Sequence, residues 1–273
     1  DITTGTNNTL MGHEAGNALT TGSYNIAIGK GALGAEDAHG RNVAIGHQAL
    51  TNQDAGADAY NVAVGFYAGE AISTGVNNVL IGGEAGDAIT TGGENIAMGR
   101  SALSAKTTGG GDVAIGHQAL QDADGGDAFN VAVGYRAGRN ITSGIRNILI
   151  GASAGDTLTA GLDNIAIGYQ ALATEDDHSY NTAVGHQALK AQDAGADAYN
   201  VAMGYRAGYA VTSGVNNITI GAEAGIALTT GSYNVAVGHG ALATEDTGGQ
   251  NVAIGRNALN TLNYAGNGMN VAV

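Results

Sequence analysis

The stretch NVAIGHQAL at residues 42–50 decides the fold, because it returns almost unchanged as DVAIGHQAL at 112–120 and in looser copies along the chain. Each copy begins with Asn, or once with Asp112, and successive copies start 17 to 19 residues apart. A fixed period of this kind is the signature of a repeat architecture. We therefore predict one repeat domain over 1–273, in which four copies make a higher repeat of 69 or 70 residues, at about 8–77, 78–146, 147–216 and, in part, 217–273.

The local pattern of each copy favours a strand. In residues 42–46 a β-branched residue alternates with Ala, and Gly46 follows, where the chain can turn. A helix is disfavoured because a Gly every few residues costs about 1 kcal/mol each. The sequence therefore predicts an all-β fold, a parallel β-solenoid of about 16 coils of 17–19 residues, stacked about 4.8 Å apart. A coil here means one copy of the repeat, from its Asn to the residue before the next one.

One position of the coil switches between two residues. The residue after the fixed Ala is only Leu or Gly. Where it is Gly, as at Gly69, a large aliphatic residue such as Ile72 follows three positions later; where it is Leu, as at Leu50, the later position is usually polar, as at Gln53. We predict one core pocket per coil, filled from either side, because protein interiors are densely packed.

The first residue of the coil predicts a ladder of stacked side-chain amides, in which each Asn bonds the next, as in other stacked β structures. Asp112 is expected to be a weak member of this ladder. The structural ladder residues singled out are Asn25, Asn42, Asn61, Asn95, Asn130, Asn164, Asn200 and Asn234.

The middle residue of the strand bears on oligomeric state. It is Ala in twelve of sixteen coils and lies on the face opposite Val43 and Ile45. Since a solvent-facing column is expected to be polar, we predict a second buried surface here, covered by other copies of the chain in a homotrimer. The alternative is a monomer with an Ala-rich surface.

The composition excludes several classes of protein. The net charge is −14 with only ten Lys and Arg residues, so nucleic acid and anionic membranes are not expected as partners. There is no Cys for a disulfide or thiolate site, and no apolar run long enough for a membrane-spanning helix. Because both ends of the chain fall within a copy, we expect the sequence to be an excerpt of a longer protein.

The phrases NVAIG, NIAIG and NVAVG, followed two residues later by AL, resemble the head repeats of trimeric autotransporter adhesins and the NTAIGxxAL repeats of phage tail fibres and bacterial surface fibres. The resemblance covers essentially the whole chain, although adhesin head coils are usually shorter. It implies a left-handed β-roll, a trimeric fibre, an extracellular location on a virion or bacterial cell surface, and a role as a stalk or adhesive shaft.

Catalytic, cofactor and metal sites are not expected. Five His residues follow the fixed Gly, but that position also holds Tyr, Phe, Lys and Arg, so no acid or nucleophile partner is constant. GKGALG at 29–34 matches a dinucleotide-binding string without the strand–helix context it needs. The acidic loops at 54–60, 122–129 and 193–199 favour solvated turns, with Ca²⁺ binding left open.

The predicted function is therefore structural, a shaft that displays a receptor-binding tip. The alternative is an adhesin whose side binds a glycan or host receptor directly, with ice binding through recurrent Thr pairs as a less favoured variant. The possible ligand-contact stripe consists of His47, His117, Tyr135, Tyr169, His186, Tyr205 and His239.

Overall fold

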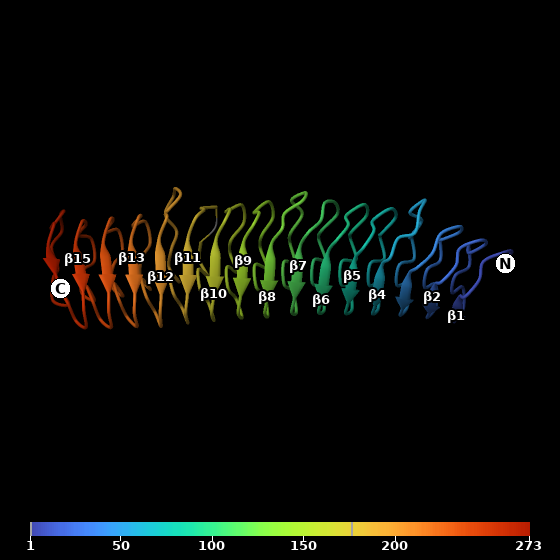
Figure 1. Cartoon of the computed structure of the whole chain (residues 1–273), viewed down its shortest axis with the longest axis horizontal. Helices are drawn as coiled ribbons and strands as arrows, with labels where there is room; N and C mark the ends of the chain where they lie inside the picture. Colours follow the sequence, from blue (N-terminus) through green and yellow to red (C-terminus); the bar gives the residue numbers. More distant parts are fainter. Residues whose placement is uncertain (1, 176) are drawn as a thin grey trace. The chain divides into compact units, whose positions relative to one another are not determined.

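A computed structural model describes residues 2–175 and 177–273, and within them every regular element is a short β-strand. Each coil contributes one strand, and the remaining residues form turns and loops (Figure 1). The strands are β1 (Thr9–Met11), β2 (Ile26–Ile28), β3 (Val43–Ile45), β4 (Val62–Val64), β5 (Val79–Ile81), β6 (Ile96–Met98), β7 (Val113–Ile115), β8 (Val131–Val133), β9 (Ile148–Ile150), β10 (Ile165–Ile167), β11 (Thr182–Val184), β12 (Val201–Met203), β13 (Ile218–Ile220), β14 (Val235–Val237), β15 (Val252–Ile254) and β16 (Val271–Ala272).

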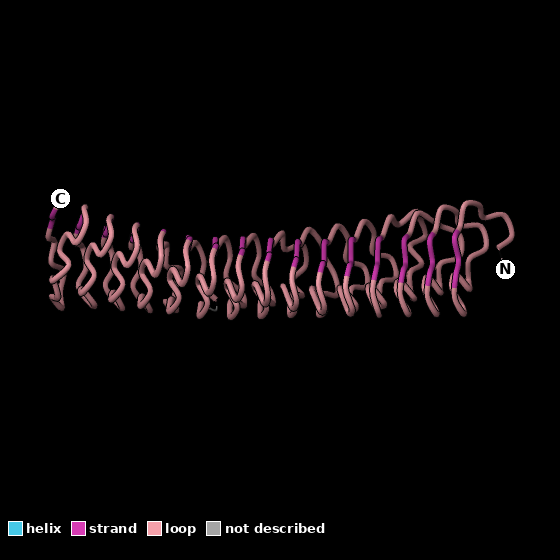
Figure 2. The backbone as a smooth tube through the Cα atoms, turned by 90° about the horizontal axis from the view of Figure 1, so that it is seen from below, coloured by secondary structure: helices cyan, strands magenta, loops and turns pink. Residues whose placement is uncertain are grey.

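The coils group into two compact units, residues 1–135 and 136–273. In the first unit β1 to β8 pair in chain order, and in the second β9 to β16 do the same. Every pairing is parallel and in register, so that Ala27 lies beside Ala44 and Ala44 beside Ala63. Figure 2 shows one strand segment per turn of the backbone in each unit. The predicted all-β parallel solenoid is confirmed, whereas the handedness and the single domain over 1–273 stay predictions.

The strand faces are the reverse of the expected arrangement. The middle residue, such as Ala44, is fully buried and points into the coil. The first and third residues face outward, and many are well exposed, Ile96 by 37 % and Ile148 by 38 %. The expectation that the Ala column forms the outer interface was therefore wrong. The inward-facing middle position is Ala in most coils and fully buried Leu80 or Leu149 in others, whereas the outward-facing positions hold mainly Ile and Val.

Close stacking explains the fixed Gly after each strand. Gly46 has φ +139°, and a Cβ atom there would collide with the backbone carbonyl of Gly65 in the next coil. An L-residue is therefore excluded twice, by its backbone conformation and by the space available.

The Leu/Gly switch has a backbone cause as well as a packing cause. The position is left-handed in both types of coil, with φ +50° at Leu50 and φ +60° at Gly69. Gly adopts this left-handed conformation without strain, whereas for Leu the burial of the side chain offsets the cost of the conformation. At Gly69 the space of the missing side chain is filled by Leu50, Ile72 and Leu80, so the predicted compensation in core volume is confirmed.

The Asn ladder exists, but it bonds mainly to backbone. The backbone N–H of Asn42 donates to Oδ1 of Asn25 at 3.0 Å, and that of Asn61 donates to Oδ1 of Asn42 at 3.1 Å. The Asn61 side-chain N–H donates to the carbonyl of Gly75 at 2.7 Å. Bonds between two side-chain amides are the minority, as from Asn78 Nδ2 to Asn61 Oδ1. All eight ladder residues singled out above are fully buried.

Asp112 keeps its place in the ladder and adds an ion pair. Its N–H donates to Asn95, and its Oδ1 accepts the N–H of Asn130 at 2.8 Å. Its Oδ2 accepts from Lys106 Nζ at 2.9 Å, and both side chains are completely buried. The usual Asn of the ladder would turn an N–H₂ group toward that ammonium, so the charge of Lys106 explains why Asp stands at this position. The expectation of a weak ladder member does not hold.

Candidate binding surfaces

The residues directly after the fixed Gly form a column that is exposed or partly exposed, here called the ring column. His47 stacks on Phe66 with ring centroids 5.3 Å apart, and His117 stacks on Tyr135 at 5.6 Å with an interplanar angle of 7°. In the second unit His186 lies between Tyr169 at 5.1 Å and Tyr205 at 5.4 Å. Parallel coils bring equivalent side chains into contact, and six of the seven predicted stripe residues therefore join ring contacts.

The ring column is interrupted at regular intervals. Gly83 stands in it in the first unit, and Ala152 and Ala222 stand in it in the second. His239, the seventh predicted stripe residue, follows Ala222, and no ring contact involves it among the described residues. The column is therefore a series of short aromatic clusters, each ending at a small residue. Half-exposed rings such as Tyr135 and Tyr205 present flat apolar faces with polar tips.

The chemistry of the ring column suits contact better than proton transfer. Nδ1 of His47 and Nδ1 of His117 are buried without a hydrogen-bond partner. A His that acts as a general base has a group that orients it and a reacting hydroxyl or thiol within reach. Stacked rings instead offer surfaces on which a sugar ring or another planar group can lie.

A second set of aromatic residues precedes the Asn of the coil. Arg41 lies between the rings of Tyr24 and Tyr60, 5.1 and 5.6 Å from their centroids, and its Nε donates to Asp58 at 2.7 Å. In the second unit Tyr180 and Tyr199 stack at 5.1 Å. These rings are about half-exposed, so they line the edge of the coils and leave much of their surface open to solvent.

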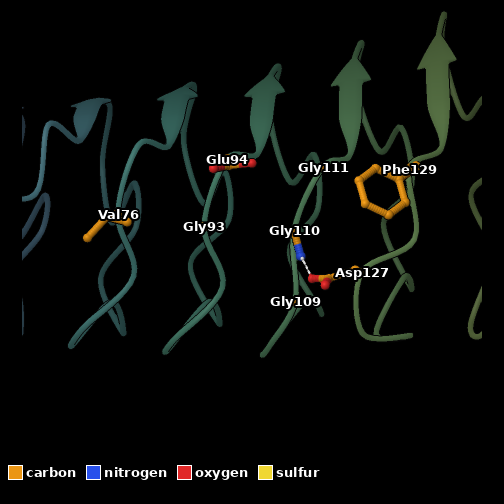
Figure 3. Close-up of a pocket in the computed structure, with 8 residues that line it drawn as sticks. All are labelled: Val76, Gly93, Glu94, Gly109, Gly110, Gly111, Asp127 and Phe129. Carbon is orange, nitrogen blue, oxygen red and sulfur yellow. Dashed lines mark hydrogen bonds between the residues drawn. The ribbon is translucent and has the colours of Figure 1, made fainter.

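A recess of about 300 Å³ lies in the first unit beside three consecutive glycines, Gly109, Gly110 and Gly111. Figure 3 shows residues that line it, with Asp127 beside the backbone of Gly110, and Glu94 and the ring of Phe129 on the coils either side of Gly111. The backbone N–H of Gly110 donates to Asp127 at 2.9 Å. One ring and two carboxylates are groups that can hold a sugar or a small cation.

A polar set inside the coils escaped the sequence analysis. Wherever a polar residue stands three positions after the Leu of the switch, it is fully buried, although the alternation of this position with aliphatic residues was visible in the sequence. Gln53 accepts from Asn61 at 2.6 Å and donates to the carbonyl of Ser73 at 3.1 Å. Such residues complete the ladder from within. The fully buried residues of this set are Glu36, Gln53, Lys106, Glu175, Gln192 and Glu245.

A further apolar surface is the strand face, defined as the first and third residues of the strands in each unit. From β1 to β8 these residues are aliphatic apart from Thr9, and from β9 to β15 they are aliphatic apart from Thr182. Neither unit places a charged residue on it. Contiguous exposed apolar surface on proteins is found at interfaces with other proteins, at membrane contacts and at ligand-binding grooves.

Comparison with family models, with curated proteins and with solved structures found no match. Among the described residues there is also no helix of the length and apolarity needed to cross a membrane.

Proposed function

We propose that this chain is the structural shaft of an extracellular fibre, a phage tail fibre or a bacterial surface fibre, which extends and displays a receptor-binding tip. Three copies associate through their strand faces, and the chain has no catalytic role. The observation that carries this proposal is the uncharged aliphatic strand face of each unit. The number of copies and the setting rest on the resemblance to adhesin and tail-fibre repeats.

Physical reasoning supports association over exposure. A parallel sheet normally has both faces covered. Here the inner face packs on the core of the coil, while Ile148 and Ile150 on the outer face are each 38 % exposed. Covering such side chains contributes roughly 25 cal/mol per Å² removed from water. A repetitive face is most simply covered by the same face of another copy, because the spacing of the coils then matches throughout.

Substitution on the strand face tests the proposal. Ile96→Lys together with Ile148→Lys places one charge on the face of each unit without touching the core. We expect the trimeric mass in light scattering to fall to that of one chain while the circular dichroism spectrum is unchanged. Thr21→Lys, on an exposed loop, is the control and should leave the trimer intact. A wild-type protein that is monomeric at every concentration would refute the proposed assembly.

A second candidate function is direct adhesion through the ring column, which the stacked cluster of Tyr169, His186 and Tyr205 favours. A glycan array probed with the wild-type chain tests it. If a glycan binds, Tyr169→Ala with Tyr205→Ala should weaken it about tenfold or more, or roughly 1.4 kcal/mol. Tyr24→Ala, outside the column, is the control. An array without hits from folded protein would leave only the structural role.

Ice binding has less support. The hydroxyl of Thr20 donates to the carbonyl of Asp37, and that of Thr229 donates to the carbonyl of Asp246 at 3.0 Å. These hydroxyls therefore bond the next coil instead of forming a free array. A thermal-hysteresis assay decides the question, and a clear effect would reopen it.

A further inference from the structure

One buried carboxylate of the first unit has an oxygen without a partner. Glu36 follows β2 and is fully buried. Its Oε1 accepts the backbone N–H of His39 at 2.9 Å, and its Oε2 is inaccessible to solvent and has no hydrogen-bond partner. Nδ1 of His39 is buried and unpartnered as well, at 3.6 Å from Glu36 Oε1. Two groups that can bind a cation are therefore left unsatisfied side by side.

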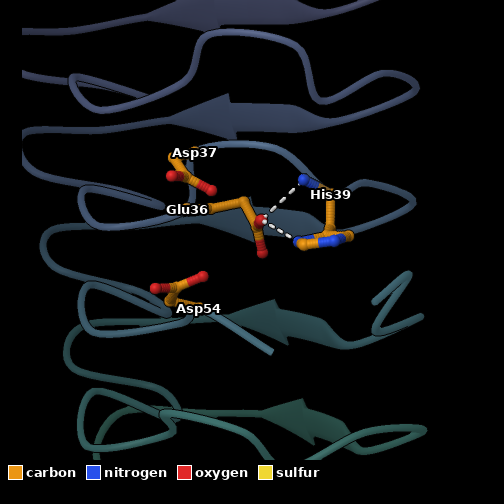
Figure 4. A group of neighbouring side chains, drawn as sticks. All are labelled: Glu36, Asp37, His39 and Asp54. Carbon is orange, nitrogen blue, oxygen red and sulfur yellow. Dashed lines mark hydrogen bonds and ion pairs between the residues drawn. The ribbon is translucent and has the colours of Figure 1, made fainter. Parts of the chain in front are cut away.

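Two exposed carboxylates complete the cluster. Asp37 comes from the same coil, and Asp54 comes from the coil of β3. Figure 4 shows both on one side of Glu36 and His39 on the other. One oxygen or nitrogen atom from each of the four residues lies within 4.8 Å of the others. Their arrangement places three acidic side chains and one imidazole around a single point.

The second unit repeats the arrangement. Glu175 is fully buried after β10, its Oε2 has no partner, and it lies with His178 and Asp193 in a cluster of the same kind. In both clusters the His is three residues after the Glu, and the Asp from the next coil is 18 residues after it. His178 differs from His39 in one respect, because its Nδ1 bonds Glu175 Oε1 at 2.6 Å. The residue equivalent to Asp37 lies outside the described residues.

The third buried Glu of the set provides an internal comparison. Glu245 has Gly248 in the place of the His and Asn263 in the place of the Asp from the next coil. There Oε1 accepts the N–H of Gly248 at 2.7 Å and Oε2 accepts the N–H of Tyr264 at 3.2 Å. Where the His and Asp are absent, backbone donors satisfy the Glu completely. Where they are present, one oxygen stays open, and the open oxygen therefore accompanies the ligand-type residues.

The electrostatics of the two clusters favour a cation. Burial raises the pKa of Glu36, the hydrogen bond from His39 and the charge of His39 oppose this shift, and the charges of Asp54 and Asp37 add to it to a smaller extent. Burial likewise raises the pKa of Glu175, against the hydrogen bonds and the charge of His178, and Asp193 adds a smaller contribution. A positive ion among these carboxylates would give the buried Glu oxygen a partner and would offset the repulsion between the carboxylates.

We propose that Glu36, Asp37, His39 and Asp54 form a binding site for a divalent transition-metal ion of the Zn²⁺ type, and that Glu175, His178 and Asp193 form a second one. A mixed set of imidazole nitrogen and carboxylate oxygen suits Zn²⁺ and its first-row neighbours, whereas Ca²⁺ and Mg²⁺ prefer oxygen alone. Each ion would join two successive coils. The first site is the tighter one, since Nδ1 of its imidazole makes no hydrogen bond, whereas that of the second site must give one up.

Titration calorimetry of the chelator-treated full chain with Zn²⁺ tests this proposal, with Co²⁺ absorption as a second readout. We expect about two ions per chain, a rise in Tm when metal is present, and a Co²⁺ spectrum that reports nitrogen and oxygen ligands. Glu36→Gln should remove the tight site and leave the weaker one, and Glu175→Gln should do the converse. Gln is tolerated at this inner position, because Gln53 and Gln192 occupy it in the neighbouring coils.

Asp54→Asn and Asp193→Asn are the second pair of variants, chosen because these side chains are exposed and Asn263 occupies the equivalent position in a coil without a site. Each should weaken its own site roughly tenfold or more. Asp122→Asn, an exposed acid outside both clusters, is the control and should change nothing. Absence of saturable binding, or binding that survives both Gln substitutions, would overturn the proposal. Equal affinity for Ca²⁺ would overturn the assignment to a transition metal.

Discussion

The two faces of a single strand differ sharply in how far their side chains are buried, although the coils themselves are alike. Ala114 in β7 points inward and is fully buried, whereas the next residue, Ile115, points outward and is 37 % exposed. The larger apolar residue is thus the exposed one, against the usual distribution. The inner side is set by the close packing of a thin coil, and the outer side is free of that constraint. Its apolar character therefore needs another cause, which we propose to be association with other copies.

The largest expected effect comes from a charge on the inner side. Ala114→Asp would bury an unpaired carboxylate and should lower the free energy of unfolding by several kcal/mol, enough to unfold the surrounding coils. Ile115→Asp makes the same chemical change one residue away and should keep the coils folded. Thermal unfolding followed by circular dichroism compares the two. Equal loss in both variants would mean that the strand faces are not distinct in the way described.

The next effect concerns the buried ion pair of the inner side. Asp112→Asn leaves the Lys106 ammonium without its counter-charge and should cost about 3–5 kcal/mol. Adding Lys106→Gln should recover most of this loss, because the same pair of residue types, at Gln53 and Asn61, bonds at 2.6 Å in the equivalent position. Denaturant unfolding measures both variants. A double variant no more stable than the single one would show that the charge pair has a further role.

A smaller effect on stability is expected from substitution of two half-buried carboxylates, one in each unit. Burial raises the pKa of Asp87, and the charges of Glu84 and Glu70 add to this shift. The equivalent Asp156 of the second unit instead pairs with Arg139 at 3.4 Å. A raised pKa in the folded state means that stability from this group is lost as the pH rises through that value. Asp87→Asn should therefore stabilise the protein at pH 7 and have little effect near pH 4.

The equivalent substitution supplies the contrast. Asp156→Asn removes the partner of a cation and should destabilise the protein at pH 7. Urea unfolding at the two pH values follows both variants. If Asp87→Asn lowered stability at pH 7, the burial of an unpaired charge at this position would be contradicted.

The repeat made the fold predictable. The period of 17 to 19 residues, the alternation in NVAIG and the fixed Gly were sufficient for a parallel β-solenoid, since few other folds satisfy all three. Which face of the strand points into the coil was not predictable in this way. Alternation separates two faces without saying which one is inside, and the usual preference for larger aliphatic residues in the core pointed to the wrong side.

The candidate sites were visible in the sequence to different degrees. The ring column follows from identical positions in stacked coils, so most of its members could be named beforehand. The buried set could not, because Glu36 and Lys106 are residue types that are normally exposed. Only the hydrogen bonds of the folded coil reveal that Glu245 is satisfied and that Glu36 is not.

Cross-linking at a single position tests the central claim most directly. The chain has no Cys, so Ile115→Cys on the strand face and Thr21→Cys on an exposed loop each carry one thiol. A short thiol-reactive cross-linker should join copies that carry Cys at position 115 and leave copies with Cys at position 21 unlinked. The wild-type protein should show a mass in analytical ultracentrifugation of three times the 26.9 kDa of one chain. Efficient linking at position 21 alone, or no linking at either position by a folded chain, would contradict an assembly built on the strand face.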